Sequence, residues 1–226
     1  SSRGIGLEIV RQLLLDNRNI VFATCRTPSS AKDLNLLNSS AKGQLHLVQL
    51  DINDESSIDS AVLECKRILG DGGLDYLLNN AGIMPVKNDF AFRTTKSHLF
   101  DTFQSNVIGT ALVSQAFLPL LEQGNRKVIM NMSSGLGSLG SGFGPIDTSY
   151  SISKAALNML TYKQASERPD MVILAMDPGW VQTDMGGPNA IIKPEDSVVP
   201  MLNLIKNATT GHSGRFFDSQ GKSLPW

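Results

Sequence analysis

Short apolar segments alternate along this chain with segments of helical periodicity. Apolar runs of this length are typical of strands buried on both faces, and a helix between two such strands returns the chain for parallel pairing. We therefore predict an α/β fold in three layers, with a doubly wound parallel sheet between two layers of helices. The expected strands cover residues 20–25, 45–50, 74–78, 127–132, 171–176 and 214–218.

The helical segments complete a single domain over residues 1–226, because no repeat, low-complexity tract or linker divides the chain. Asp54 or Ser56 is expected to cap the second helix, and Gly109 to interrupt the third. The expected helices cover residues 7–15, 97–121, 150–166 and 194–207, and the second helix runs from its Asp54 or Ser56 cap to about residue 69.

Composition excludes several classes of protein. The net charge of −1 gives no electrostatic reason to expect nucleic acid or an anionic membrane as a partner, and no apolar run is long enough to span a bilayer. Cys25 and Cys65 are too few for a disulfide framework, which predicts a reducing, cytoplasmic location. The three histidines match no metal-ligand spacing, so no metal is expected.

Polar and glycine-rich residues follow the predicted strands at their carboxyl ends, where sheets of this kind bind ligands. The glycine turn Ser1–Gly6 precedes a helix whose free N–H groups suit a pyrophosphate. The other segments at this edge are Cys25-Arg26, Asp51-Ile52, Asn79–Gly82, Ser133-Ser134 and Pro178-Gly179.

Tyr150 and Lys154 are four residues apart, and these positions share one face of a helix. An ammonium beside a phenol favours the phenolate and lowers the pKa of the tyrosine, which could then transfer a proton near neutral pH. Alone, the pair is equally typical of a solvated helix face.

Together these motifs resemble the short-chain dehydrogenase/reductase family, whose fold is of the Rossmann type. Residues 178–187 (PGWVQTDMGG) and the final Leu224-Pro225-Trp226 resemble the carbonyl reductase-like branch that includes sniffer and the C-factor proteins. The signposts, in order, are the glycine turn, Asn79–Gly82, Asn106, Ser134, Tyr150-x-x-x-Lys154 and residues 178–183.

The glycine turn departs from the family pattern Gly-x-x-x-Gly-x-Gly. Only Gly4 and Gly6 are present, because the first glycine and its strand would precede Ser1. We expect an incomplete sequence record, with a naturally truncated, inactive product as the alternative. Without that strand, two strand edges in the sheet should lack partners.

The resemblance implies a dinucleotide cofactor, and Arg26 indicates which one. Relatives that prefer NAD carry a carboxylate at the end of this strand, whereas a guanidinium can bind a 2′-phosphate through two hydrogen bonds. Arg3 adds a second positive charge, so NADP(H) is favoured over NAD(H). The cofactor-binding residues implied are Ser2, Arg3, Ile5, Arg26, Asp51, Ile52, Asn80, Ala81, Gly82, Tyr150, Lys154, Val181 and Thr183.

Each of these residues has an implied place along the cofactor. Asp51 should meet the adenine amino group while Ile52 packs on the ring. The segment 80–82 should line the ribose on the nicotinamide side, with Val181 and Thr183 near the carboxamide and phosphate.

The resemblance also implies a catalytic tetrad. Tyr150 gives a proton to the carbonyl oxygen, and Ser134 polarises that oxygen, although Ser133 stays an alternative. Lys154 lowers the pKa of Tyr150 and binds ribose hydroxyls, and Asn106 holds a water that links Lys154 to solvent. Apolar residues expected around the substrate are Met84, Phe143, Trp180 and Met185.

The function these features favour is an NADPH-dependent reductase of a small-molecule ketone, aldehyde or quinone. The alternative is a non-catalytic dinucleotide-binding regulator of the same fold. A sugar-nucleotide epimerase is disfavoured, because the part after Asp177 is too short for a substrate lobe. Relatives pair through the two long helices, so a homodimer or homotetramer is expected.

Overall fold

The strands of the computed structural model, which describes residues 1–226, follow the apolar segments of the chain. All six predicted strands form within two residues of their expected bounds, and a short C-terminal strand was not anticipated. The strands are β1 (Ile20–Cys25), β2 (Gln44–Gln49), β3 (Tyr76–Asn79), β4 (Val128–Met132), β5 (Val172–Asp177), β6 (Phe216–Asp218) and β7 (Ser223–Leu224).

The strands pair in two groups. β1 pairs with β2, and the second sheet has the order β3-β4-β5-β6-β7, with every pair parallel except β6–β7. One edge of β1 and one edge of β3 therefore lack a strand partner, as expected. The backbone nitrogen of Ser1 donates to the carbonyl oxygen of Thr24 at 2.6 Å, and Gly6 lies against the side chain of Asn80. Residues 1–6 thus lie between the carboxyl ends of β1 and β3.

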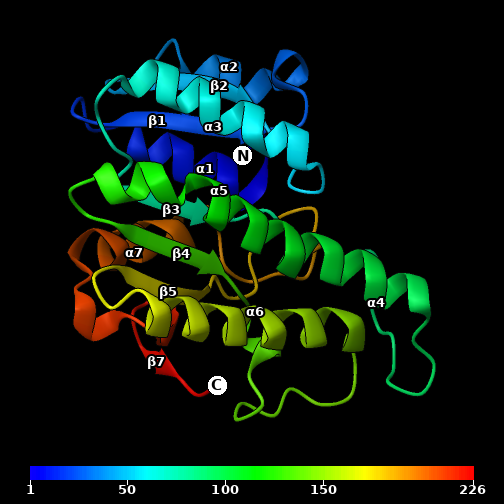
Figure 1. Cartoon of the computed structure of the whole chain (residues 1–226). Coiled ribbons are helices and arrows are strands. Elements are labelled where there is room, and N and C mark those ends of the chain that lie inside the picture. The colour runs from blue at the N-terminus through cyan, green and yellow to red at the C-terminus, as the bar shows by residue number, and fades with distance from the viewer.

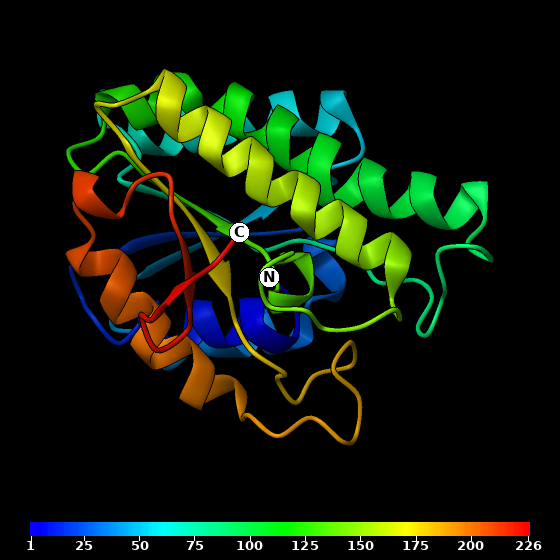
Figure 2. The same ribbon diagram turned by 90° about the horizontal axis from the view of Figure 1, so that it is seen from below.

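Helices cover both faces of the strands, which gives the predicted three layers (Figures 1 and 2). Helices α3, α5 and α6 pack on one face, and α1, α2 and α7 on the other. The short α2 was not predicted. The helices are α1 (Gly4–Leu13), α2 (Lys32–Leu37), α3 (Glu55–Leu69), α4 (Lys96–Phe103), α5 (Thr110–Gln123), α6 (Thr148–Glu167) and α7 (Pro194–Asn207).

The long helix predicted over residues 97–121 is interrupted as expected, by a π-helical segment at Gln104–Gly109. Gly109 is required there, because a Cβ would lie 2.7 Å from the carbonyl oxygen of Ile52. Short π segments inside α-helices are frequent at functional sites. This one carries Asn106, which is fully buried.

Alternation along β4 distributes its side chains between the two helical layers. Val128, Met130 and Met132 pack with α1 and α7, whereas Ile129 packs with α5 and α6. Successive side chains of a strand point to opposite faces, so an all-apolar strand fills two cores at once.

No helix of the structure is both long and apolar enough to cross a membrane.

Buried polar side chains join the sheet to the helices on one face. The side-chain amide of Asn79 donates to Asn131 and to Ser114, both at 2.9 Å. Asn131 in turn donates to Thr161 at 2.9 Å and to Gln164 at 3.0 Å. The expectation that Asn79 supports its strand end through side-chain bonds is confirmed.

Replacing Asn131 by Ala should lower the free energy of unfolding by about 3 kcal/mol, because it leaves several buried polar groups without partners. Urea unfolding measures the change. Asn17→Ala, at an exposed position in the loop after α1, is the control and should change stability by less than about 0.5 kcal/mol. A loss below about 1 kcal/mol for Asn131→Ala would contradict the role assigned to this network.

Candidate active site

The Tyr150–Lys154 pair lies in the first turns of α6, and both side chains are buried, with 8% and 3% of their surface exposed. The ammonium of Lys154 is 5.5 Å from the centre of the Tyr150 ring and donates a hydrogen bond to the carbonyl oxygen of Met132 at 2.7 Å. Because Met132 ends β4, this bond fixes α6 against the carboxyl edge of the sheet. The alternative that Tyr150 and Lys154 merely lie on a solvent-exposed helix face is therefore excluded.

Burial, rather than Lys154, dominates the acidity of Tyr150. Removal from water raises the pKa of the phenol, a hydrogen bond with Ser134 opposes this, and the charges of Asp177 and Asp147 raise the pKa further. The expectation that Lys154 lowers the pKa of Tyr150 is therefore wrong for this structure. Burial also lowers the pKa of Lys154, to about 8, which weakens its influence on the phenol.

The structure separates the two serines that follow β4. Ser133 is buried, and its hydroxyl donates to Asn158 of α6. Ser134 is partly exposed, accepts a hydrogen bond from the N–H of Leu136 at 3.2 Å, and favours the phenolate form of Tyr150 through a hydrogen bond. Ser134 is thus the serine that faces the phenol.

Asn106 links the π segment to the chain that follows β3. Its carbonyl oxygen accepts from the N–H of Ile83 at 2.7 Å, and its amide donates to the carbonyl oxygen of Ile83 and to Ser153, both at 2.9 Å. A Cβ at Gly82 would lie 3.2 Å from the Asn106 oxygen and 3.4 Å from the Lys154 nitrogen. Asn106 and Lys154 therefore meet at Gly82, and the bound water stays a prediction.

The start of α1 has the features of a phosphate site. Arg3 is the N-cap, no side chain caps the helix, and no acidic residue lies in its first turn. A Cβ at Gly4 would lie 3.1 Å from Thr183, and one at Gly6 would lie 2.9 Å from Asn80. Free N–H groups, a positive helix end and close backbone approach fit a dinucleotide pyrophosphate.

The two arginines predicted to bind a 2′-phosphate are both exposed. Arg26 directly follows β1 and makes no side-chain bond in the structure. Arg3 forms an ion pair with Asp184 at 3.1 Å, with 77% of each side chain exposed. A pair this exposed contributes little, so it does not prevent Arg3 from binding another anion.

The remaining predicted cofactor residues lie at the same edge of the strands. Asp51 and Ile52 follow β2, and the N–H of Asp51 donates a hydrogen bond to the hydroxyl oxygen of Ser57 at 2.9 Å. Val181 is buried and bridges to Ile192. The others are Ser2 and Ile5 around the start of α1, Ala81 in the segment after β3, and Thr183 in the segment after β5.

Sequence reasoning missed Asp177, the last residue of β5. Its carboxylate accepts from the N–H of Gly179 at 3.1 Å, and burial raises its pKa. A Cβ at Gly135 would lie 3.2 Å from its other oxygen, so Asp177 lies beside the loop that carries Ser134. The signal for it was an acid directly before Pro178.

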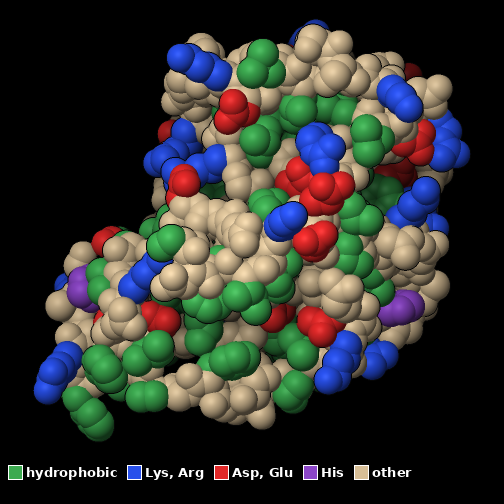
Figure 3. Space-filling view, turned by 180° about the vertical axis from the view of Figure 1, so that it is seen from behind, with side chains coloured by type: hydrophobic (Ala, Val, Ile, Leu, Met, Phe, Trp, Pro, Cys, Tyr) green, Lys and Arg blue, Asp and Glu red, His purple; other side chains and the backbone are tan.

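Apolar side chains surround this edge. Phe143 is 57% exposed, and its ring lies about 3.0 Å from where a Gly135 side chain would begin. Trp180 is 52% exposed and donates its indole N–H to the carbonyl oxygen of Gly186 at 2.9 Å, while Met185 is 39% exposed and Met84 half-buried. Figure 3 shows many exposed apolar side chains at and below the protruding lobe on the lower left.

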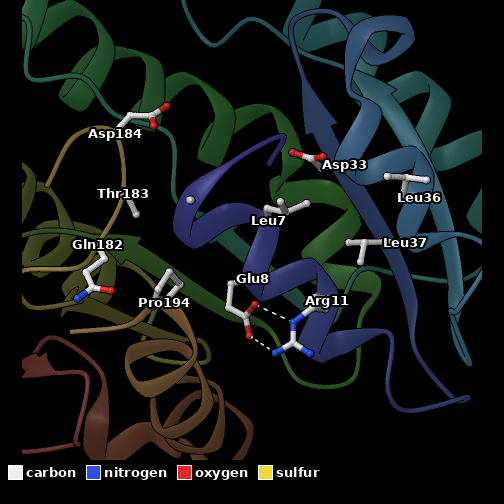
Figure 4. Close-up of a pocket in the computed structure, with 11 residues that line it drawn as sticks. Leu7, Glu8, Arg11, Asp33, Leu36, Leu37, Gln182, Thr183, Asp184 and Pro194 are labelled. Atoms are coloured by element: carbon white, nitrogen blue, oxygen red, sulfur yellow. Dashed lines mark hydrogen bonds and ion pairs between the residues drawn. The ribbon is translucent and has the colours of Figure 1, made fainter. Parts of the chain in front are cut away.

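A groove of about 440 Å³ lies beside the start of α1 and is drawn in Figure 4. It is bounded by α1, α2 and the segment after β5, and the Glu8–Arg11 ion pair, with atoms 2.7 Å apart, forms part of its lining. Gly4 and Thr183 belong both to this groove and to the phosphate site, whereas none of the four predicted catalytic residues lines it.

Comparisons with known proteins agree with this geometry. A family model described as short chain dehydrogenase matches residues 1–190. The C-signal of Myxococcus xanthus is 40% identical over 162 residues, which covers 69% of this chain and 94% of that protein. The structure of carbonyl reductase Sniffer of D. melanogaster matches with a TM-score of 0.93 at 30% identity, over 100% of this chain and 96% of that one. The NADPH-bound carbonyl reductase from chicken fatty liver matches with a TM-score of 0.92 at 34% identity, over 100% and 91%.

The fold and the matching family model together identify the chain as an oxidoreductase with a dinucleotide-binding fold. The chain belongs to the short-chain dehydrogenase/reductase family, and its similarity to Sniffer and C-signal confirms the predicted branch.

Replacing Lys154 by Met should stabilise the protein at pH 7 by about 2 kcal/mol, because the depressed pKa of about 8 reflects a buried charge whose cost exceeds its single hydrogen bond. Between the folded pKa of about 8 and the ordinary value of 10.5, the unfolded chain binds more protons than the folded one. Wild-type stability therefore rises with pH across this window, and the advantage of the variant should shrink.

Urea unfolding at pH 7 and pH 10.5 measures this difference. Lys163→Met, an exposed position on the same helix, is the matched control and should change stability little at either pH. A Met variant that is less stable than wild type at pH 7 would contradict the account of Lys154.

Proposed function

We propose that this protein is an NADPH-dependent reductase that converts a small-molecule carbonyl compound into an alcohol. The observation that carries the proposal is the meeting of three features at one edge of the sheet. These are the buried Tyr150–Lys154 pair facing Ser134, the uncapped start of α1, and two exposed arginines near that start. The similar carbonyl reductase from chicken fatty liver is described as NADPH-bound, which supports the choice of cofactor.

The nicotinamide cofactor, when bound, supplies the hydride that reduces the carbonyl carbon. Tyr150 donates its phenolic proton to the carbonyl oxygen, and its raised pKa keeps that proton in place until the oxygen becomes basic. Ser134 donates a hydrogen bond to the same oxygen and stabilises the developing charge. Lys154, whose ammonium lies 5.5 Å from the centre of the Tyr150 ring, would bind the ribose hydroxyls of the cofactor beside the phenol.

Other residues hold and orient the cofactor. The N–H groups of Arg3, Gly4 and Ile5 at the start of α1 bind the pyrophosphate. Arg26 and Arg3 bind a 2′-phosphate, with Arg3 leaving its weak pair with Asp184. The segment 80–82 lines the ribose next to Lys154 and Asn106.

Exposed apolar side chains on α4 and α6 support a proposal that the protein forms a homodimer or homotetramer. Phe100 and Ile152 are 61% and 47% exposed, and both line a hollow of about 590 Å³ between these helices. Apolar patches of this kind are typical of association surfaces.

A second candidate function is a non-catalytic, dinucleotide-binding regulator. The observation in its favour is the 40% identity to a protein named C-signal. Against it stands the completeness of Ser134, Tyr150 and Lys154, because a protein that only binds the nucleotide has no need for all three. NADPH binding without turnover on any carbonyl would favour the regulator over the reductase.

Replacing Tyr150 by Phe should lower kcat for carbonyl reduction by about 10²- to 10⁴-fold, because the proton donor is lost. Oxidation of NADPH, followed by its absorbance with a panel of ketones, aldehydes and quinones, measures the rate. Tyr162→Phe, at an exposed position on the same helix, is the control. Full activity of the Tyr150 variant would remove this residue from the mechanism.

Replacing Arg26 by Ala should raise KM for NADPH about ten-fold and leave KM for NADH unchanged, because only NADPH carries the 2′-phosphate that the guanidinium binds. Arg18→Ala, an exposed arginine paired with Asp16, is the matched control and should change neither value. An equal rise in KM for NADPH and for NADH would show that Arg26 does not bind the 2′-phosphate.

A further inference from the structure

Two carboxylates outside the predicted site join the loop after β3 to the start of the helix that carries Tyr150. The loop, residues 80–95, is called here the β3–α4 loop. Asp89 of this loop and Asp147 before α6 are 7% and 9% exposed, and neither forms an ion pair with a lysine or arginine. Buried carboxylates need hydrogen-bond partners, and both find them in the opposite segment.

Asp89 caps α6 from outside the helix. Its carboxylate accepts from the N–H of Ser149 at 3.1 Å, and its carbonyl oxygen accepts from the N–H of Thr148 at 3.2 Å. These are first-turn N–H groups, which have no partner within a helix, and α6 has no side-chain cap of its own. The hydroxyl of Thr94 donates to the same carboxylate at 2.8 Å and holds it in place.

Asp147 makes the corresponding contact from the start of α6 to the β3–α4 loop. Its carboxylate accepts from the N–H of Asn88 at 2.7 Å, while its carbonyl oxygen accepts from Ser151 at 2.8 Å in the first turn of α6. Residues 88–89 and residues 147–149 therefore hold each other through three inter-segment bonds, two made by Asp89 and one made by Asp147. We call this set the Asp89–Asp147 clamp.

The backbone is strained on both sides of the clamp. Asn88 and Asp147 have φ angles of 59° and 58°, and Lys127 is the one other non-glycine residue with positive φ. Left-handed backbone is uncommon in residues other than glycine, with Asn and Asp the most tolerant of it, and it concentrates at functional sites. Here the two strained residues are bonded directly to each other.

The clamp has a position that matters for the proposed reaction. Tyr150 directly follows Ser149, whose N–H the clamp holds, and α6 begins beside the β3–α4 loop (Figures 1 and 2). The other end of the loop is bonded to Asn106 through both polar groups of Ile83. The loop therefore connects the two helices that carry Asn106 and Tyr150.

We infer that Asp89 and Asp147 are positioning residues for the proposed reductase, because their clamp fixes the first turn of α6 and with it the phenol of Tyr150. This inference rests on the proposed function. It assigns no contact with substrate or cofactor to either residue, so cofactor binding should not depend on the clamp.

Asp89→Ala and Asp89→Asn separate the hydrogen bonds from the charge. The Asn oxygen can still accept from Ser149 and Thr94, whereas Ala removes the acceptor. We expect Asp89→Ala to lower kcat by at least about ten-fold, since small misplacement of a reacting group is costly, with KM for NADPH within about two-fold of wild type. Asp89→Asn should stay within about three-fold in kcat. Asp59→Ala, an exposed carboxylate on α3, is the control.

Asp147→Gly provides a second variant that should fold readily. Glycine relieves the positive φ at this position but removes the acceptor for Asn88. Because the relief at φ offsets part of the lost hydrogen bond, we expect the variant to remain folded under the assay conditions but to lose at least about five-fold in kcat. A clamp that mattered only for stability would predict unchanged kcat in this variant.

Amide hydrogen exchange of residues 148–151, followed by mass spectrometry, gives a readout that needs no activity. Exchange should accelerate at least about ten-fold in Asp89→Ala and stay near wild type in Asp89→Asn. Unchanged exchange in Asp89→Ala, or kcat within about two-fold of wild type in both Asp89→Ala and Asp147→Gly, would overturn the inference. If wild-type protein reduces no carbonyl, the proposed function fails, and the exchange result alone shows whether the clamp orders α6.

Discussion

The parallel register of β3, β4 and β5 is the constraint on which the rest of the structure depends. Asn79 pairs with Asn131, and Met132 with Met176, so three strands end at one level. Each of these strands is followed by a short polar segment, and the three segments lie at the same edge of the sheet. Lys154 reaches this edge by bonding to the last carbonyl of β4, which brings α6 and Tyr150 to the place where the strand ends meet.

Burial at this edge produces an electrostatic conflict that shapes the chemistry. The interior raises the pKa of Tyr150 and lowers that of Lys154, so both side chains tend toward their neutral forms. Asp177 adds a negative charge beside the phenol and favours its protonated form further. A phenol that holds its proton suits a donor to a carbonyl oxygen, and Ser134 is the group in the structure that stabilises the phenolate left behind.

The sequence predicted the strands and the edge at which the site forms, because apolar runs and the polar residues after them are local patterns. The interruption of the long helix near Gly109 was predicted for the same reason, because a glycine within a helical segment is a local signal. The direction of the Tyr150 pKa shift was not, since it depends on how much protein covers the phenol, and spacing along a helix carries no information on cover. Asp89 and Asp147 were missed because their partners lie about sixty residues away and no motif marks them. The separation of Ser133 from Ser134 likewise required the position of Asn158.

The measurement that tests the central claim most directly is isotope transfer from the cofactor to the product. Protein is incubated with a carbonyl compound and NADPH carrying deuterium at both positions of nicotinamide C4, and the alcohol is analysed by mass spectrometry. The account predicts one deuterium on the former carbonyl carbon, at a rate that collapses in the Tyr150→Phe variant. An alcohol without deuterium, or no alcohol from any carbonyl despite bound NADPH, would contradict it.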